Sequence, residues 1–158
     1  MALTVFLRGA NVGGRNVFRP AEVAAKLPRL RVTSIGAAGT FVVGAAMTAA
    51  EARRAFERAL GFETHILVRP AAEILSLVAA DPFRDHAIGS DVKAYVTVLE
   101  RRPSPAPRTP LRMPDGAAWQ VSVIAVRGVF ALSLHRRAGR TLVYPNEAIE
   151  KRLGLAAT

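Results

Sequence analysis

The residues best suited to binding a ligand lie close together near the N-terminus, where a strand predicted over Thr4–Leu7 runs into a loop. The loop holds three glycines, two arginines and two asparagines, namely Arg8, Gly9, Asn11, Gly13, Gly14, Arg15 and Asn16. Glycine permits positive φ and leaves its N–H uncovered, asparagine tolerates left-handed geometry, and arginine supplies a fork of donors. We therefore predict an anion site here, completed by Gly39 and Thr40 of a neighbouring turn.

The same loop also has a purely structural interpretation, in which its glycines only turn the chain from the strand into a helix. Other chemistry looks weaker. His65 lies in an apolar stretch and is predicted to be packed, and the cluster of Asp81, Asp85 and His86 is explained by a helix that stops at Asp81-Pro82. The chain contains no cysteine, so thiolate chemistry and disulfides are excluded. We predict no metal and no cofactor, and whether the chain is an enzyme stays open.

Composition favours a folded chain with an excess of positive charge. Lysine and arginine number 22 against 12 acidic residues, which gives a formal net charge of +10. This charge predicts either an acidic partner such as nucleic acid, or an ordinary surface rich in arginine. Stacking platforms at Phe41, Tyr95 and Trp119, with basic side chains at Arg136, Arg137 and Arg140, would suit RNA. Core packing is the simpler role for Phe41, and a solvated turn for the arginines.

No apolar run approaches the roughly 20 residues that a membrane span needs, and the N-terminus shows no signal-peptide pattern. We therefore expect a cytoplasmic protein with no membrane contact.

The elements that position the loop are predicted from periodicity and from start and stop signals. Thr48 and Glu51 form a capping box for a helix that runs to Leu60. The first part reads strand 4–7, short helix from Pro20, strands 31–35 and 40–43, helix 49–60 and strand 64–69. This β-α-β-β-α-β order is that of a ferredoxin-like plait, with Val23, Leu27, Phe56 and Leu60 in its core.

The second part is an incomplete echo of the first. It reads helix 70–80 with Ile74, Leu75 and Val78 on one side, strand 92–99, strands 119–126 and 129–134, and a last helix capped by Asn146. Five prolines place Arg101–Pro114 in a loop outside both cores. The predicted fold class is α+β, with two ferredoxin-like subdomains over residues 1–69 and 70–158, the second incomplete and carrying a proline-rich loop at 101–114.

Four stretches, in order, resemble the bacterial domain-of-unknown-function 1697 family. Leu7–Gly14 is similar to its opening Leu-Arg-Gly-Ile-Asn-Val-Gly-Gly, and Ala37–Val43 to its Gln-Ser-Gly-Asn-Val-Val-Phe hairpin. Phe62–Phe83 is similar to its strand, helix and Ala-Asn-Pro-Phe segment, and Asn146–Thr158 to its C-terminal end. The resemblance implies an α+β fold of two plait-like subdomains. The family has no established function.

One departure bears on the site. The family's Gln-Ser-Gly-Asn is Ala37-Ala38-Gly39-Thr40 here, so two amide side chains and one hydroxyl are missing and only the Thr40 hydroxyl is gained. If those polar residues form the family's site, this protein has an altered one.

The leading hypothesis is a small-molecule or anion-binding protein that uses the glycine-rich loop. One alternative is nucleic-acid binding through an arginine-rich surface. A second is an acylphosphatase-like phosphate hydrolase, because acylphosphatases share the strand order and place a phosphate loop and then Phe-Arg after the first strand, as Phe18-Arg19 stand here. The asparagine expected on a central strand has no clear counterpart at Thr40.

Overall fold

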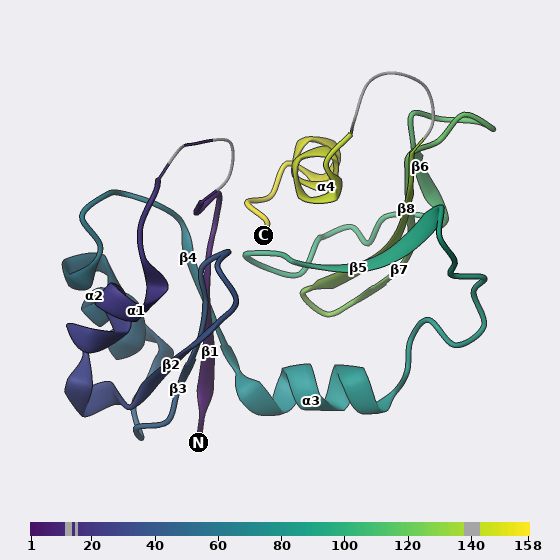
Figure 1. Ribbon diagram of the computed structural model, residues 1–158. Helices are drawn as coiled ribbons and strands as arrows, with labels where there is room; N and C mark the ends of the chain where they lie inside the picture. The colour runs from purple at the N-terminus through teal and green to yellow at the C-terminus, as the bar shows by residue number, and fades with distance from the viewer. Residues whose placement is uncertain (12–13, 15, 138–142) are drawn as a thin grey trace. The chain divides into compact units, whose positions relative to one another are not determined.

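The computed structural model describes residues 1–11, 14, 16–137 and 143–158 (Figure 1). This part of the chain is α+β, with two four-stranded antiparallel sheets and four α-helices. It divides into two compact units, Met1–Ala80 (unit 1) and Asp81–Thr158 (unit 2). The predicted division after residue 69 differs from this one by a single helix, and it stays a prediction, because a compact unit need not be a unit that folds alone.

Unit 1 contains β1 (Leu3–Leu7), α1 (Pro20–Ala25), the 3₁₀ helix η1 (Pro28–Leu30), β2 (Val32–Ile35), β3 (Thr40–Val43), α2 (Ala49–Ala59), β4 (Ile66–Pro70) and α3 (Ala71–Ala79). Its sheet has the order β2-β3-β1-β4, and every pair is antiparallel. The prediction that strands 4–7 and 64–69 share one sheet is confirmed. In this register Phe6 lies opposite Thr40, and Leu7 lies opposite Ile66.

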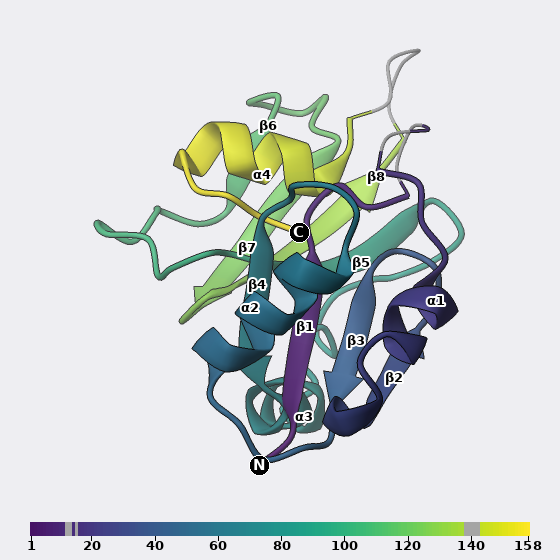
Figure 2. The same cartoon turned by 90° about the vertical axis from the view of Figure 1, so that its left-hand side faces the viewer.

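Helices α1 and α2 lie on one face of this sheet (Figure 2). The four predicted core residues, Val23, Leu27, Phe56 and Leu60, are all buried there, which confirms them. Phe56 and Phe41 are completely buried, and their ring centroids lie 5.0 Å apart. Burying two aromatic rings in contact is a large apolar contribution to stability. Packing of the helices therefore stabilises the sheet that carries the loop after β1.

The predicted capping box at the start of α2 is confirmed. The Thr48 N–H donates to the Glu51 carboxylate at 2.7 Å, and the Glu51 N–H donates to the Thr48 hydroxyl at 3.2 Å. The bonds to the Glu51 carboxylate, first from the Thr48 N–H and then from its hydroxyl, hold the pKa of Glu51 below its ordinary value of 4.5. This end of α2 is thus fixed by residues three apart in sequence.

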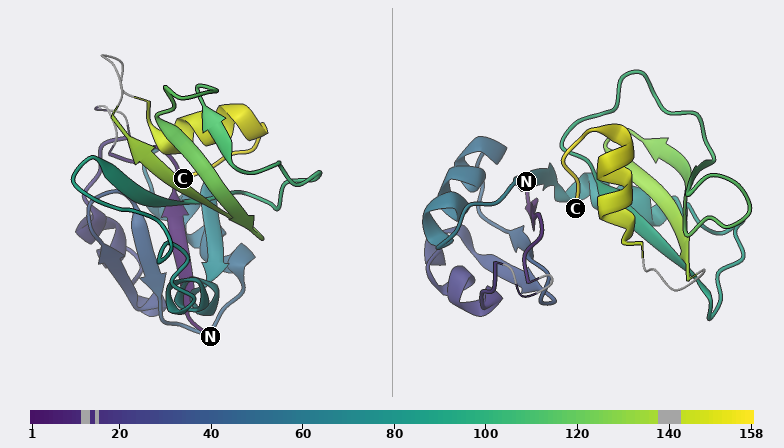
Figure 3. Two further views of the ribbon diagram at one scale, coloured as in Figure 1. Left: turned by 90° about the vertical axis from the view of Figure 1, so that its right-hand side faces the viewer. Right: turned by 90° about the horizontal axis from the view of Figure 1, so that it is seen from above.

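Unit 2 contains β5 (Val92–Val98), β6 (Leu111–Met113), β7 (Val121–Arg127), β8 (Phe130–Arg136) and α4 (Pro145–Leu153). Its sheet has the order β5-β8-β7-β6, again with antiparallel pairs. Helix α4 lies on one face of this sheet (Figures 1 and 3). The apolar core there includes Leu99, Val121, Val123 and Ile149. The predicted β7–β8 hairpin is confirmed, with Gly128 at its turn (φ 61°).

The prediction that Arg101–Pro114 is wholly a loop outside the cores is wrong. Residues 111–113 form β6, which pairs with β7, and Leu111 and Met113 pack against the core of unit 2. The reason is that Pro110 and Pro114 flank the strand, so the residues between them keep their backbone N–H groups. Pro103 is also buried.

Two predictions about helices are also wrong. Asn146 is not the N-cap of α4: Tyr144 takes that position, Pro145 opens the helix, and the Asn146 side chain accepts a hydrogen bond from the Thr97 hydroxyl at 2.7 Å. In α3, Leu75 and Val78 were expected on a packed side but are 69% and 68% exposed. The buried residue of α3 is Leu77.

Candidate functional site

The end of β1 is held on both sides by its neighbouring segments. The Leu7 N–H donates to the Gly39 carbonyl and the Arg8 N–H to the His65 carbonyl, each at 2.9 Å. The Arg8 carbonyl accepts from the Thr64 hydroxyl at 2.6 Å. The chain therefore enters the loop from a fixed point between the turn before β3 and the start of β4.

The side chain of Asn11 ties the loop together. Its Nδ2 donates to the Phe18 carbonyl at 3.0 Å and to the Ala37 carbonyl at 2.7 Å, while its Oδ1 accepts from the Phe18 N–H at 2.9 Å. The Asn11 N–H also donates to the Asn16 carbonyl at 3.3 Å. Both amide hydrogens of Asn11 are thus used inside the protein. Asn11 therefore has a structural role among the predicted site residues, because its side chain has no N–H left to donate to a ligand.

The first turn of the loop has alternating backbone geometry. Gly9 (φ 63°) and Asn11 (φ 53°) are left-handed, and Ala10 between them has negative φ. Where the residue between two left-handed ones is right-handed helical, such alternation turns successive N–H groups toward one side and forms a concave anion site. No hydrogen bond among the described residues uses the N–H of Gly9 or Ala10, although Ala10 is only 1% exposed. Buried backbone donors nearly always have a partner, so the N–H of the buried Ala10 suits a bound anion, and the N–H of the exposed Gly9 is accessible to the same ligand.

Two further described residues of the loop also have positive φ. Gly14 (φ 74°) and Asn16 (φ 48°) are also left-handed, and a Cβ at Gly9 or Gly14 would meet no atom within 4 Å. These glycines therefore serve backbone conformation, not close packing. Gly13 and Arg15, which were predicted to belong to the site, lie outside the described residues.

The turn before β3 lies directly against the loop. Gly39 is buried with φ 82°, and a Cβ there would stand 2.9 Å from the Cβ atoms of both Leu7 and Ala10. Only glycine allows this approach. Thr40 begins β3 and is half-buried opposite Phe6. The structure thus brings Gly39 next to Ala10, and Ala37 next to Asn11, as the prediction of a neighbouring turn required.

The β1 segment and the loop after it carry basic side chains and no acidic one. Arg8 is exposed, and the segment from Leu3 to Arg19 contains no acidic residue. His65 is exposed as well, so the prediction that it is packed is wrong: β4 begins one residue later, at Ile66. The loop therefore combines unused backbone donors with a cationic side chain, an arrangement that can hold an anion.

Sequence reasoning missed Thr64 and His65 as neighbours of the loop. Both contact the Arg8 backbone, yet they stand 56 and 57 positions away along the chain. The antiparallel pairing of β1 with β4 is the signal that predicts this contact, since Leu7 opposite Ile66 leads directly to Arg8 beside His65.

Most other predicted chemistry has a structural explanation here. Phe41 is completely buried, and the Trp119 ring is covered by Arg136, whose Cζ lies 4.0 Å from the ring centroid. Arg136 also donates to the Trp119 and Ala117 carbonyls, so it helps to shape the β6–β7 connection. Tyr95 is 38% exposed, and its ring meets His135 edge-on. Arg140 lies outside the described residues.

Within the described ranges, no three histidine or carboxylate side chains gather as a metal ion would require. Asp85, a member of the predicted cluster of Asp81, Asp85 and His86, forms an ion pair with Arg84. The distance from the Arg84 Nε to the Asp85 Oδ2 is 3.6 Å. No helix in the described part of the chain is long and apolar enough to cross a bilayer.

Comparison with known protein families identifies the family of this chain. A family model described as "Protein of unknown function (DUF1697)" matches residues 1–126. That range contains all of unit 1 and unit 2 as far as β7, so the C-terminal resemblance at 146–158 lies beyond it. No curated protein and no solved structure matches the chain. Because the match covers most of the sequence, the chain belongs to the DUF1697 family.

Proposed function

We propose that this protein binds a small anionic molecule at the loop after β1. The observation that carries the proposal is the pair of unused amides at Gly9 and Ala10, which stand in a turn of alternating φ beside the exposed Arg8. Backbone donors of this geometry attract anions, and an arginine next to them adds a charged fork of donors. The ligand class is a carboxylate or a phosphate group.

The Asn11 hydrogen bonds support the proposal because they hold the residue that follows the two amides in place. Its side chain bonds to Phe18 and to Ala37 at 2.7 to 3.0 Å. A turn at Gly9–Asn11 that is already held loses less conformational freedom on binding, which strengthens binding. Asn11 is therefore a positioning residue, while Arg8 is a contact residue. Gly13, Arg15 and Asn16 remain proposed members of the site.

We further assign to unit 1 a ferredoxin-like plait, and to unit 2 an incomplete relative of it. The assignment for unit 1 rests on its β-α-β-β-α-β order with β1 central, between β3 and β4. Unit 2 lacks a helix between β5 and β6 among its described residues, and its last three strands form a meander. The fold places the loop at the end of a central strand, but it does not name the ligand.

Nuclear magnetic resonance of ¹⁵N-labelled protein tests the anion site. Addition of inorganic phosphate or citrate is expected to shift the amides of Gly9 and Ala10 in a saturable way. Arg8→Ala is expected to weaken binding about tenfold, the loss of one charge-assisted contact. Arg53→Ala is the matched control, because Arg53 is an exposed arginine on α2 outside the loop. If neither anion moves the loop amides, or if Arg8→Ala leaves the affinity unchanged, the proposal fails.

A turnover assay distinguishes the acylphosphatase-like alternative from a protein that only binds its ligand. The alternative requires hydrolysis of an acyl phosphate that disappears in Arg8→Ala, whereas a binding protein gives the amide shifts without turnover. Asn11 follows the loop amides directly in sequence, and its two side-chain amide hydrogens already bond to the Phe18 and Ala37 carbonyls. We therefore favour binding over hydrolysis.

A further inference from the structure

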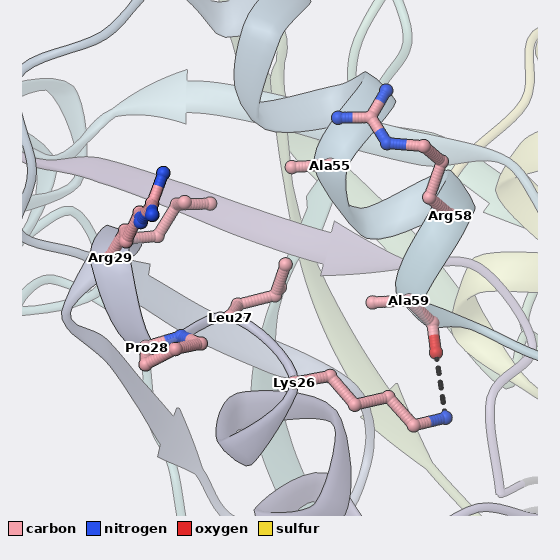
Figure 4. A pocket seen from close by; sticks show the side chains of 8 residues that line it. Lys26, Leu27, Pro28, Arg29, Ala55, Arg58 and Ala59 are labelled. Carbon is pink, nitrogen blue, oxygen red and sulfur yellow. Dashed lines mark hydrogen bonds between the residues drawn. The ribbon is translucent and has the colours of Figure 1, made fainter.

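A second candidate site lies in unit 1, on the face of the sheet that carries the helices. It is a groove of about 400 Å³ between α2 and the segment that joins α1 to β2 (Figure 4). Lys26, Leu27, Pro28, Arg29 and Leu30 line it from one side, and Ala55, Arg58 and Ala59 from the other. None of these residues belongs to the loop after β1. The volume falls in the range of small-molecule sites.

The floor of the groove is apolar. Leu27, Ala55 and Ala59 are 9%, 8% and 7% exposed, and Leu30 packs against the same core. Ala55 and Ala59 stand one helical turn apart on α2, so they share a face. Because both side chains are methyl groups, they leave space where a longer residue would fill the groove. An apolar group of a ligand can be removed from water here.

The rim of the groove is cationic. Lys26, Arg29 and Arg58 are exposed, with Arg29 and Arg58 on opposite sides of the space (Figure 4). The Lys26 Nζ donates to the Ala59 carbonyl at 3.1 Å, which fixes the ammonium group at the C-terminal end of α2. No carboxylate among the described residues pairs with any of these three cations within 4.0 Å. The two guanidinium groups of Arg29 and Arg58 thus have no carboxylate partner there, whereas the Lys26 ammonium has the Ala59 carbonyl as one partner.

We propose that this groove binds an amphipathic anion, a small molecule with a carboxylate or phosphate head and a short apolar body. The head fits the rim, where two guanidinium groups and one ammonium group offer charge-assisted hydrogen bonds. The body fits the floor of Leu27, Ala55 and Ala59. An inorganic anion would leave the space above that apolar floor unfilled, and a neutral apolar molecule would leave the cations unpaired, so neither suits the groove as well.

Isothermal titration calorimetry with octanoate, below its micelle concentration, tests this inference. Octanoate should bind saturably and at least tenfold more tightly than acetate, which has only the head, or 1-octanol, which has only the body. Arg29→Gln and Arg58→Gln should each weaken octanoate binding about threefold to tenfold, since each removes one charge-assisted contact. Ala55→Leu should abolish it by filling the groove, with circular dichroism confirming that the variant folds.

Two controls make the test specific. Arg53→Gln removes an exposed arginine of α2 that does not line the groove, and it should leave octanoate binding within twofold of the original. The loop after β1 is itself proposed to bind carboxylates, so all titrations are repeated in an Arg8→Ala background. That background should lose the weak binding at the loop and keep the tighter octanoate binding at the groove, which separates the two sites. Octanoate binding no tighter than that of acetate overturns the inference. Octanoate binding that neither Arg29→Gln nor Arg58→Gln weakens also overturns the inference.

Discussion

At the scale of single residues, two glycines in one turn have different roles. Gly36 and Gly39 are both left-handed, at φ 63° and 82°. A Cβ at Gly36 would meet nothing within 4 Å, whereas a Cβ at Gly39 would press on Leu7 and Ala10 at 2.9 Å. Gly36→Ala should cost about 1–2 kcal/mol from conformation alone. Gly39→Ala should cost about 2–4 kcal/mol, because crowding adds to that strain.

Urea unfolding of both variants measures the difference. Equal losses for Gly36→Ala and Gly39→Ala would show that the contact of the turn with Ala10 does not constrain the loop.

Asn11 and Asn16 form a second natural pair, since both are asparagines with positive φ. Of these two asparagines, only Asn11 makes side-chain hydrogen bonds within the described part of the chain, and it makes three. Asn11→Ala should therefore lower the free energy of unfolding by about 2–4 kcal/mol more than Asn16→Ala does, at about 1 kcal/mol per bond. Chemical denaturation of the two variants gives this number, and a difference near zero would remove Asn11 from its structural role.

The sequence could predict which residue types gather after β1, but not what each one does. Glycine, arginine and asparagine are visible as donors in any loop. The structural role of Asn11 depends on a hydrogen bond to the Ala37 carbonyl, 26 positions away. Ala37 lies in a turn that only the pairing of β1 with β3 brings close to Asn11. The same holds for Thr64, whose hydroxyl contacts the Arg8 carbonyl across 56 positions.

At the scale of elements, the capping box of α2 predicts a dependence on pH. Because the folded-state pKa of Glu51 lies below its ordinary value of 4.5, the stabilisation is fully present above that value and is lost as pH falls through the lowered one. Glu51→Gln keeps an oxygen acceptor but does not titrate. The original protein should thus be more stable than Glu51→Gln near pH ~7, and this advantage should shrink toward pH ~3.

Urea unfolding of both proteins across that range measures the advantage, because carboxylates common to the two cancel in the difference. Glu57→Gln, on the same helix but outside the capping box, is the control. An advantage of the original protein that stays constant from neutral to acid pH would contradict the assignment.

The strand β6 gives a second prediction at this scale. Leu111 is half-buried against the core of unit 2, whereas Arg108, in the same proline-rich segment, is exposed. Leu111→Ala should therefore cost about 1–2 kcal/mol, less than a fully buried leucine, while Arg108→Ala should stay within about 0.5 kcal/mol of the original. Thermal unfolding measures both variants, and a Leu111→Ala protein as stable as Arg108→Ala would mean that β6 does not contribute to the core.

Elements with local signals could be predicted well. The Thr48–Glu51 capping box starts α2 by contacts three residues apart, and the spacing of Phe56 and Leu60 marks the face that is buried. Elements defined by a distant partner could not. Leu111–Met113 is too short to show a strand pattern, and only its pairing with β7 makes it one. Asn146 resembles a cap by type, but Pro145 already opens the helix and Thr97 uses the side chain.

At the scale of the whole molecule, the positive charge is not balanced by ion pairs. The chain carries 22 basic and 12 acidic side chains, and the pairs Arg19–Glu22 at 3.3 Å and Arg84–Asp85 at 3.6 Å join exposed groups. Exposed pairs of this kind contribute about 0–1 kcal/mol. The net charge of +10 therefore acts mainly on what approaches the protein, not on its fold.

This charge predicts weak association with nucleic acid that is driven by counterion release. Filter binding to RNA and to duplex DNA should show affinity that falls steeply between about 50 mM and 200 mM salt, at a log–log slope of about −0.7 to −0.9 for each phosphate neutralised. Arg8→Ala should reduce the magnitude of that slope by at most about 1, because it removes one of many cations. Tight binding that persists at the higher salt concentration and prefers one sequence would instead support the nucleic-acid alternative, since phosphate contacts alone carry no sequence information.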